Sequence, residues 1–211
     1  MGKKKITIPT DLDDIKLGQA QQFLIVQGRE DIDDLVKWIH CVATFSGWTM
    51  EQVAGIKTKT IKELYAKIFE VLNNTHIGDV KRFFSFKGVE YGLEPDMRQM
   101  QAGAFIDIDT MIKDDYIKNL HKIMAILYRP VTSKVEGFYQ IADYVKEAQH
   151  EKEYREKLFL NKMSYSYVRA LTIFFSTLAE TLTISYQSKA DQAQAEEEDS
   201  KVGAGSTVYL N

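Results

Sequence analysis

The chain has 211 residues, enough for one domain with short arms and for a sizeable buried core. Its composition, 45% hydrophobic and 27% charged, is typical of a globular protein and excludes a disordered or fibrous one. The formal net charge is −3, and a single cysteine, Cys41, excludes an internal disulfide.

The charge is unevenly distributed along the chain. Residues 188–211 contain two lysines and five acidic residues, so the preceding 187 residues are neutral overall. A neutral body argues against specific nucleic-acid binding. Lys3 to Lys5 form a short basic arm, which we interpret as solvated, with a phosphate-binding arm as the alternative. The most apolar stretch, 170–184, contains Glu180 and is too short and polar to span a bilayer, and no signal peptide is apparent, so we expect a protein of the cytoplasm.

Most of the chain has helical periodicity. Residues 10–14 offer capping side chains for a first predicted helix that runs to about Val26 and ends at Gly28. The next predicted helices are residues 31–46, a short turn capped by Thr49 through Ala54, and a long helix from Thr58 or Thr60 to 72. In the second, apolar residues at three- and four-residue steps predict one buried stripe: Ile32, Leu35, Val36, Ile39, Val42 and Ala43. In the last, the predicted inner face is Ile61, Leu64, Tyr65, Ile68, Phe69 and Leu72.

The period then changes. Residues 84–93 alternate around Lys87-Gly88, which predicts a small β-hairpin that must pack on helices or pair with another strand. A short helix is expected from about Met97. A stronger helix should begin at Asp109 as its N-cap, or at Asp114-Asp115, and end before Pro130.

The second half is predicted to begin with a loop of strand character at 131–141, most extended at 138–141. Residues 146–157 are highly charged and indicate a solvated helix or lid, weakly attached to the core. Ser164 is expected to cap a long helix whose apolar residues repeat every seven positions, which favours core packing, with association between subunits as the alternative.

The fold class predicted is mainly α: a helical bundle with a small β-hairpin insertion and an extended C-terminal tail. We expect a single mostly helical domain at 1–187, followed by an acidic linker and C-terminal arm at 188–211. The arm contains a short strand-forming run, Thr207 to Leu210. We expect the body or a neighbouring subunit to hold it, and favour its addition to the sheet edge of another chain.

The sequence has no motif with the spacing of a known catalytic or metal site. A pair of carboxylates for acid–base work stays open, because any two of the thirty acidic residues could meet in space, but nothing singles out such a pair. The four histidines, His40, His76, His121 and His150, have no metal-ligand spacing. Cys41 is interpreted as a core residue rather than a nucleophile. The aspartates at 11–14 and 31–34 do not continue into a calcium loop, so helix capping explains them. Phosphate-binding glycine loops and a serine-hydrolase elbow are missing too. We therefore expect no enzyme, cofactor or metal.

Several segments resemble a family of small proteins in tailed phages of Bacteroidetes, which includes the crAss-like phages. They are Phe86 to Gly92 with Glu94 to Asp96, Phe105 to Asp109, Leu120 to Val131, Tyr139 to Tyr144, Ile6 to Pro9, and Leu17 to Gln19. The likeness spans roughly residues 6–185, by pattern rather than by a catalytic signature. The charged segment 146–157 and the tail after Ser188 depart from the pattern, so the role of the tail is not inherited.

The resemblance implies a role in the virion or in its assembly. We expect a structural component, in the neck or tail or packaged as cargo, that contacts other virion proteins in multiple copies and lies in the host cytoplasm before assembly. The alternatives are a tail assembly chaperone absent from the mature particle, and an enzyme that modifies a host target. The expected partner contacts are Phe86, Val89, Tyr91, Val208, Tyr209 and Leu210. Tyr128-Arg129-Pro130 is either a helix end with a partly buried arginine, which we favour, or a binding feature.

Overall fold

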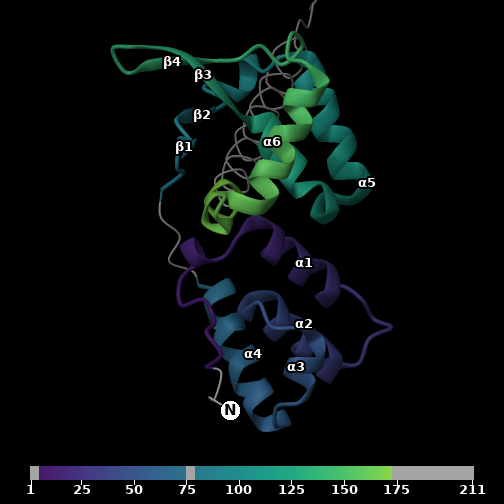
Figure 1. The fold of residues 1–211 in the computed structure, drawn as a ribbon. Helices are drawn as coiled ribbons and strands as arrows, with labels where there is room; N and C mark the ends of the chain where they lie inside the picture. Colours follow the sequence, from purple (N-terminus) through teal and green to yellow (C-terminus); the bar gives the residue numbers. More distant parts are fainter. Residues whose placement is uncertain (1–4, 75–78, 173–211) are drawn as a thin grey trace, which may run out of the picture. The chain divides into compact units, whose positions relative to one another are not determined.

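The computed structural model describes residues 5–74 and 79–172, which are mainly α-helical with a small antiparallel sheet (Figure 1). The chain divides into two compact units after Ala170, and the elements below belong to the first unit. The predicted domain end at 187 and the arm at 188–211 lie outside the described residues.

The first part of the chain forms helices close to the predicted ones. They are the 3-10 helix η1 (Leu12–Asp14), α1 (Leu17–Gln27), α2 (Asp34–Ser46), α3 (Met50–Ala54) and α4 (Thr58–Leu72). Local signals set several ends: the Thr49 hydroxyl accepts from the backbone N–H of Gln52, and Gly47 ends α2 in the left-handed conformation with φ of 70°. The aspartates at 11–14 cap η1 as expected, since the Asp11 carboxylate accepts from the backbone of Asp13.

The capping residues at 10–14 were predicted to begin one helix that runs to about Val26; its end at Gly28 is confirmed, but its continuity is wrong. Ile15 and Lys16 are extended and separate η1 from α1. The reason is a tertiary contact: the backbone N–H of Leu17 donates to Met163, and that of Tyr165 donates to Ile15. These two hydrogen bonds join segments that are far apart in the sequence. They replace the backbone hydrogen bonds of a continuous helix, which the local sequence favours.

The buried side of α2 also differs from the predicted stripe. Leu35 and Val36 are each 39% exposed, whereas Cys41, Val42 and Phe45 are buried. Burial concentrates in the second half of α2, where Phe45 packs against Phe23 of α1 at 6.0 Å between ring centroids. In α4 the prediction holds for Ile61, Ile68 and Leu72, which are buried, but Phe69 is 45% exposed.

The sheet has four strands, β1 (Phe83–Phe86), β2 (Val89–Leu93), β3 (Tyr128–Val135) and β4 (Phe138–Ile141), in the order β1-β2-β3-β4. The predicted hairpin at 84–93 is confirmed. It pairs with a second hairpin formed by residues that were predicted as a loop with strand character. The partner strand that a lone hairpin requires is thus supplied by the segment that follows the long helix α5 (Ala102–Leu127).

Helix α5 begins earlier than predicted. The short 3-10 helix η2 (Met97–Gln99) precedes it, and Asp109 lies inside α5 and pairs with Lys113, so its expected role as N-cap is wrong. The alternative helix start at Asp114-Asp115 corresponds to a break within α5. Asp115 has non-helical angles, and its carboxylate accepts from the backbone N–H of Lys118, as an N-cap does for a new helix.

The charged segment is not a weakly attached lid, which corrects the prediction for 146–157. It forms most of α6 (Gln149–Lys162), which packs on α5 and α1. Three residues of α6 are buried: Arg155, Leu158 and Phe159. The error has a physical cause, because an arginine with a buried partner is indistinguishable in sequence from a solvated one.

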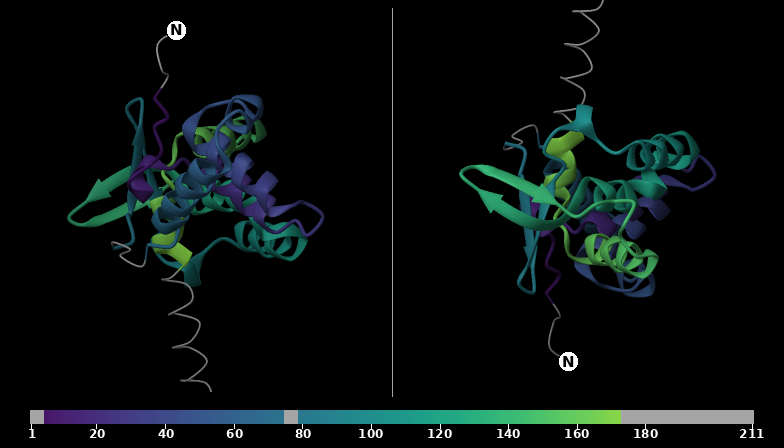
Figure 2. Two further views of the ribbon diagram at one scale, coloured as in Figure 1. Left: turned by 90° about the horizontal axis from the view of Figure 1, so that it is seen from below. Right: turned by 90° about the horizontal axis from the view of Figure 1, so that it is seen from above.

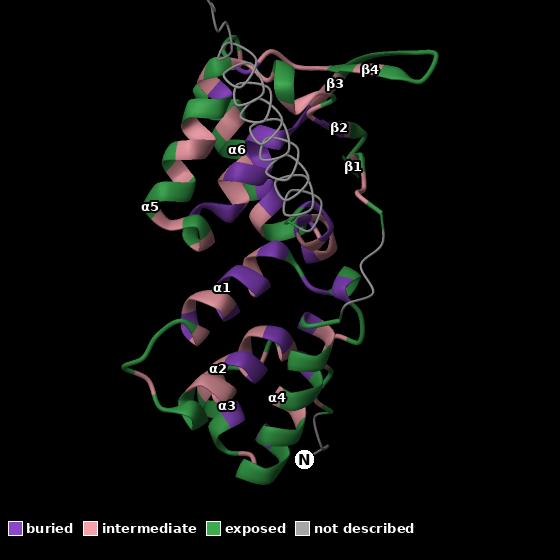
Figure 3. Ribbon diagram, turned by 180° about the vertical axis from the view of Figure 1, so that it is seen from behind, coloured by how far each residue is buried: buried purple, intermediate pink, exposed green. Residues whose placement is uncertain are grey.

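A further helix begins at Tyr165, and Ser164 caps it by accepting from the backbone N–H of Ser166. Of the apolar residues in its predicted seven-residue repeat, Val168 and Leu171 are buried, and the repeat beyond 172 lies outside the described residues. Figure 3 shows burial concentrated where the sheet, α1, α5 and α6 face one another. In the part of the chain that the structure describes, no helix is long and apolar enough to cross a membrane.

Candidate protein-contact site

The turn between β1 and β2 decides which side chains share a face. Lys87 and Gly88 both have positive φ, 49° and 79°, as in a two-residue hairpin turn that matches the twist of the strands. The register pairs Phe86 with Val89 and Phe84 with Tyr91. Side chains of paired residues project to the same side of a sheet, so these four lie on one face of the hairpin.

The inner end of that face belongs to the core. The rings of Phe84 and Tyr91 pack edge-on against Phe159 of α6, at 5.4 and 5.3 Å between centroids. Tyr128 adds a further edge-on contact to Phe159 at 6.4 Å. Tyr91 is only 5% exposed, so its ring is a core residue more than a contact residue.

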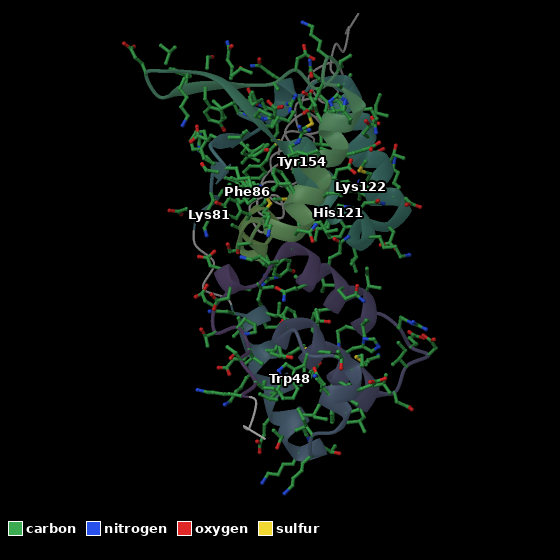
Figure 4. All side chains as sticks on the ribbon, in the orientation of Figure 1. Trp48, Lys81, Phe86, His121, Lys122 and Tyr154 are labelled. Atoms are coloured by element: carbon green, nitrogen blue, oxygen red, sulfur yellow. The ribbon has the colours of Figure 1, made fainter. Side chains whose placement is uncertain are left out.

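The outer end of the same face is open. Val89 is 42% exposed and Phe86 is half-buried. Between this end and α6 lies a cavity of about 900 Å³, here called the hairpin groove. Its lining comes from β2, β3, the segment after β4 and α6: Val89, Tyr91, Pro130, Thr132, Ala142, Asp143, Lys146, Glu147, His150, Glu151, Tyr154 and Arg155. Figure 4 labels Phe86 on the hairpin and Tyr154 on α6.

A buried ion pair fixes one wall of the hairpin groove. Arg155 and Glu147 pair through two contacts, with side chains 3% and 5% exposed. The Nε–H of Arg155 also donates to the carbonyl oxygen of Ala125 in α5, at 2.7 Å. Because Arg155 is held by both partners, the wall is preformed. At the rim, Lys146 pairs with Asp143 at 3.5 Å.

A second exposed apolar feature is the turn between β3 and β4. Glu136 and Gly137 have φ of 44° and 86°, again a two-residue turn. Val135 and Phe138 flank the turn and pair with each other, and they are 67% and 82% exposed. We call residues 135–138 the arm tip. It projects beyond the helices in the views of Figures 1 and 2, and Figure 3 shows it as exposed.

The structure brings together three of the predicted contact residues. Val89 and Tyr91 line the hairpin groove, and Phe86 shares their face. Val208, Tyr209 and Leu210 lie outside the described residues. Sequence analysis missed Phe138, Val135 and Tyr154. A signal for the arm tip was present, since Glu136-Gly137 lies between two apolar residues, as Lys87-Gly88 does in the first hairpin.

Tyr128, Arg129 and Pro130 follow the end of α5 and are the first residues of β3, whereas the favoured interpretation was a helix end with a partly buried arginine. Arg129 pairs with Glu94, and it donates to the carbonyl oxygen of Ala142 at 2.9 Å. Its side chain is 3% exposed, and burial lowers the pKa of its guanidinium, against the opposing effect of Glu94. Arg129 thus joins β3 to the segments on both sides of it.

The remaining candidates for chemistry are the single cysteine and the possible metal ligands. Cys41 is buried, and desolvation raises the pKa of its thiol to about 12, which keeps it protonated at neutral pH. Residues 5–74 and 79–172 contain no group of three or more His, Cys, Asp or Glu side chains placed to hold a metal ion. Comparison with family models, curated proteins and solved structures finds no match for this chain.

Proposed function

We propose that the protein is a non-enzymatic structural component of a tailed-phage virion, a neck or tail subunit or a packaged cargo protein, that acts through protein–protein contacts. The observation that carries the proposal is the pair of apolar surfaces on one small sheet. The hairpin groove has Val89 and Tyr154 partly exposed, and at the arm tip Val135 and Phe138 are 67% and 82% exposed. Exposed apolar groups gathered in this way are typical of interaction sites.

The two surfaces differ in what they offer a partner. The hairpin groove is concave and has a preformed wall, so it suits an inserted side chain or an extended segment. The arm tip is convex, and its aromatic ring suits insertion into a pocket of another protein. Aromatic residues that become fully desolvated commonly dominate the energy of an interface.

The buried charges support a structural role. Arg155 is neutralised by Glu147, and Arg129 by Glu94. Both arginines also bond to backbone carbonyl oxygens, of Ala125 and Ala142. Groups committed to such bonds hold elements in place, whereas a catalytic acid or base needs one face open to a substrate.

The finer parts of the proposal come from the sequence. The fold is a helical bundle whose C-terminal segment 188–211 serves as an arm. The partners are other phage virion proteins, and several copies of the chain are present in the assembly. The protein lies in the host cytoplasm before assembly and in the virion afterwards. The neutral charge of residues 1–187 favours protein partners over specific nucleic acid or membrane.

The proposal is tested by quantitative mass spectrometry of gradient-purified particles, with copies counted against the major capsid protein. We expect a fixed stoichiometric presence. Absence from particles, with abundant protein in the infected-cell lysate, would contradict the structural role and favour the tail assembly chaperone.

The role of the arm tip is tested by Phe138→Ser, with Phe105→Ser as the matched control. Phe105 is also an exposed phenylalanine, at 62%, but lies on α5. We expect Phe138→Ser to fold normally and to lower the number of copies per particle at least about fivefold, which corresponds to about 1 kcal/mol of lost contact. Equal incorporation of both variants would exclude the arm tip as a contact.

A further inference from the structure

A second cavity lies where α1, the end of α4 and the helix that begins at Tyr165 meet. Its lining shares no residue with that of the hairpin groove. Its volume is about 240 Å³. Five apolar side chains line it, Ala20, Phe23 and Leu24 from α1 and Phe69 and Leu72 from α4, and Tyr165 adds its ring. Phe23, Leu72 and Tyr165 are less than 9% exposed, whereas Phe69 reaches the surface.

Three side chains with amide or guanidinium groups also line this cavity, Gln27, Asn73 and Arg169, and the side-chain amide of Asn73 already donates to the carbonyl oxygen of Phe69 at 2.8 Å. The Nε2 atom of Gln27 and the Nε atom of Arg169 are both buried, and neither has a hydrogen-bond partner among residues 5–74 and 79–172. The carbonyl oxygen of the Gln27 amide accepts from the Tyr65 hydroxyl at 3.3 Å, which accounts for the orientation of the amide and leaves its N–H groups unused. Among the described residues no carboxylate forms an ion pair with Arg169.

Unsatisfied buried donors are costly, and a native protein rarely keeps two of them in one cavity without a purpose. Here both are N–H donors, one belongs to a permanent cation, and the surrounding walls are apolar. The complementary group is therefore an anionic acceptor with two oxygens attached to an apolar body. A carboxylate has this geometry, because each of its oxygens can accept from a separate donor.

We propose that this cavity binds a small carboxylate with an apolar tail, its oxygens accepting from Arg169 and Gln27 and its tail lying among Phe23, Leu24, Phe69 and Leu72. The site is separate from the proposed contact surfaces and does not depend on the virion role. The volume limits the ligand to a short-chain acid, since drug-sized ligands occupy roughly 300–1,000 Å³.

The test is isothermal titration calorimetry of the full chain with hexanoate. Acetate, which lacks the tail, and hexanamide, which lacks the charge, are the matched controls. We expect hexanoate to bind with a dissociation constant on the order of 1 mM, as small ligands do, and both controls to bind at least about tenfold more weakly. Hexanamide binding as tightly as hexanoate would overturn the assignment of a carboxylate.

Two variants test the donors. Arg169→Met and Gln27→Leu each remove one unsatisfied donor and retain apolar volume. We expect Arg169→Met to fold with an unchanged or raised thermal midpoint, and Gln27→Leu to fold with a slightly lower one, because it also removes the acceptor of the Tyr65 hydroxyl. Both should weaken hexanoate binding at least about tenfold. Arg98→Met is the control, because Arg98 is 90% exposed and pairs only with nearby Asp96, and it should bind as the unmodified chain does.

If one variant fails to fold, the other still tests the proposal, because each removes a donor from a different helix. The proposal is overturned if hexanoate does not bind at about 10 mM, which is the result expected when ordered water satisfies both donors. It is equally overturned if the folded Arg169→Met and Gln27→Leu variants bind hexanoate as tightly as the unmodified chain.

Discussion

The two hairpins of the sheet have the same kind of turn but different surroundings. Each turn has two residues with positive φ, Lys87-Gly88 in the first and Glu136-Gly137 in the second. The first hairpin lies against α6 through Phe84 and Tyr91, so most of it is core. The second is buried where it begins, at Tyr128 and Arg129, and at its turn Phe138 is 82% exposed.

This comparison shows that turn chemistry specifies a hairpin but not its environment. The first hairpin has a helix beneath it and gains stability from aromatic packing. The second pairs with the first through β2 and β3. Tyr139 adds a further attachment, since its ring packs edge-on against Phe83 at 4.7 Å and its hydroxyl donates to the carbonyl oxygen of Leu93 at 2.6 Å. Its exposed tip therefore contributes little to folding and is available for a partner.

The largest expected effect is a difference in the free energy of unfolding between a substitution beneath the first hairpin and one at the tip of the second. Phe159 is completely buried and contacts Phe84, Tyr91 and Tyr128. We expect Phe159→Ala to lower the free energy of unfolding by about 3–5 kcal/mol, because it leaves a cavity beneath the first hairpin. Phe138→Ala at the arm tip should change it by less than about 0.5 kcal/mol. Urea unfolding of both variants checks this, and similar losses would contradict the comparison.

An intermediate effect is expected at the junction between the hairpins. A Cβ atom at Gly92 would lie 2.8 Å from Tyr139, too close for both to keep their places. We expect Gly92→Ala to displace the Tyr139 ring and to cost about 1–2 kcal/mol through overpacking. Hydrogen exchange should become faster in β4 than in β1. Equal exchange rates in the two strands would show that Tyr139 does not attach the second hairpin.

The smallest effect concerns the root of the first hairpin. Lys81, just before β1, pairs with Asp13 at 2.6 Å, and Asp13 also accepts from Ser166. The bonds from Lys81 and Ser166 lower the pKa of Asp13 in the folded protein. The resulting stabilisation is present above the pKa of the unfolded chain, about 3.9, and is lost as pH falls through the lower folded value.

We therefore expect Asp13→Asn to reduce the acid sensitivity of unfolding below about pH 4 and to change stability only slightly in magnitude, because the pair is partly solvated. Thermal midpoints of both proteins between neutral pH and about pH 3 check this. Parallel pH profiles would exclude Asp13 as a source of the dependence.

Local signals allowed the sequence to predict what depends on near neighbours. The cap at Thr49, the end of α2 at Gly47 and the turn at Lys87-Gly88 are all encoded within a few residues. The sequence could not predict the break at Ile15, because it depends on backbone bonds to Met163 and Tyr165, about 150 residues away. For the same reason the burial of α6 was missed.

In the candidate site, too, the sequence predicts what near neighbours determine and misses what distant segments bring together. The face shared by Phe86, Val89 and Tyr91 follows from the register of one hairpin, so sequence alone placed these residues together. Tyr154 joins them only because α6 packs beneath the sheet. The paired donors of the second cavity are equally invisible in sequence, since Gln27 and Arg169 are brought together from opposite ends of the described chain.

The central claim is that the arm tip contacts another protein in the assembled particle. Its most direct test is a photo-reactive phenylalanine analogue at position 138, with position 105 as the exposed control, followed by irradiation of purified particles. The account predicts a cross-link from 138 to one defined virion protein and none to that protein from 105. Particles that contain the chain but yield no cross-link from 138, or the same products from both positions, would contradict it.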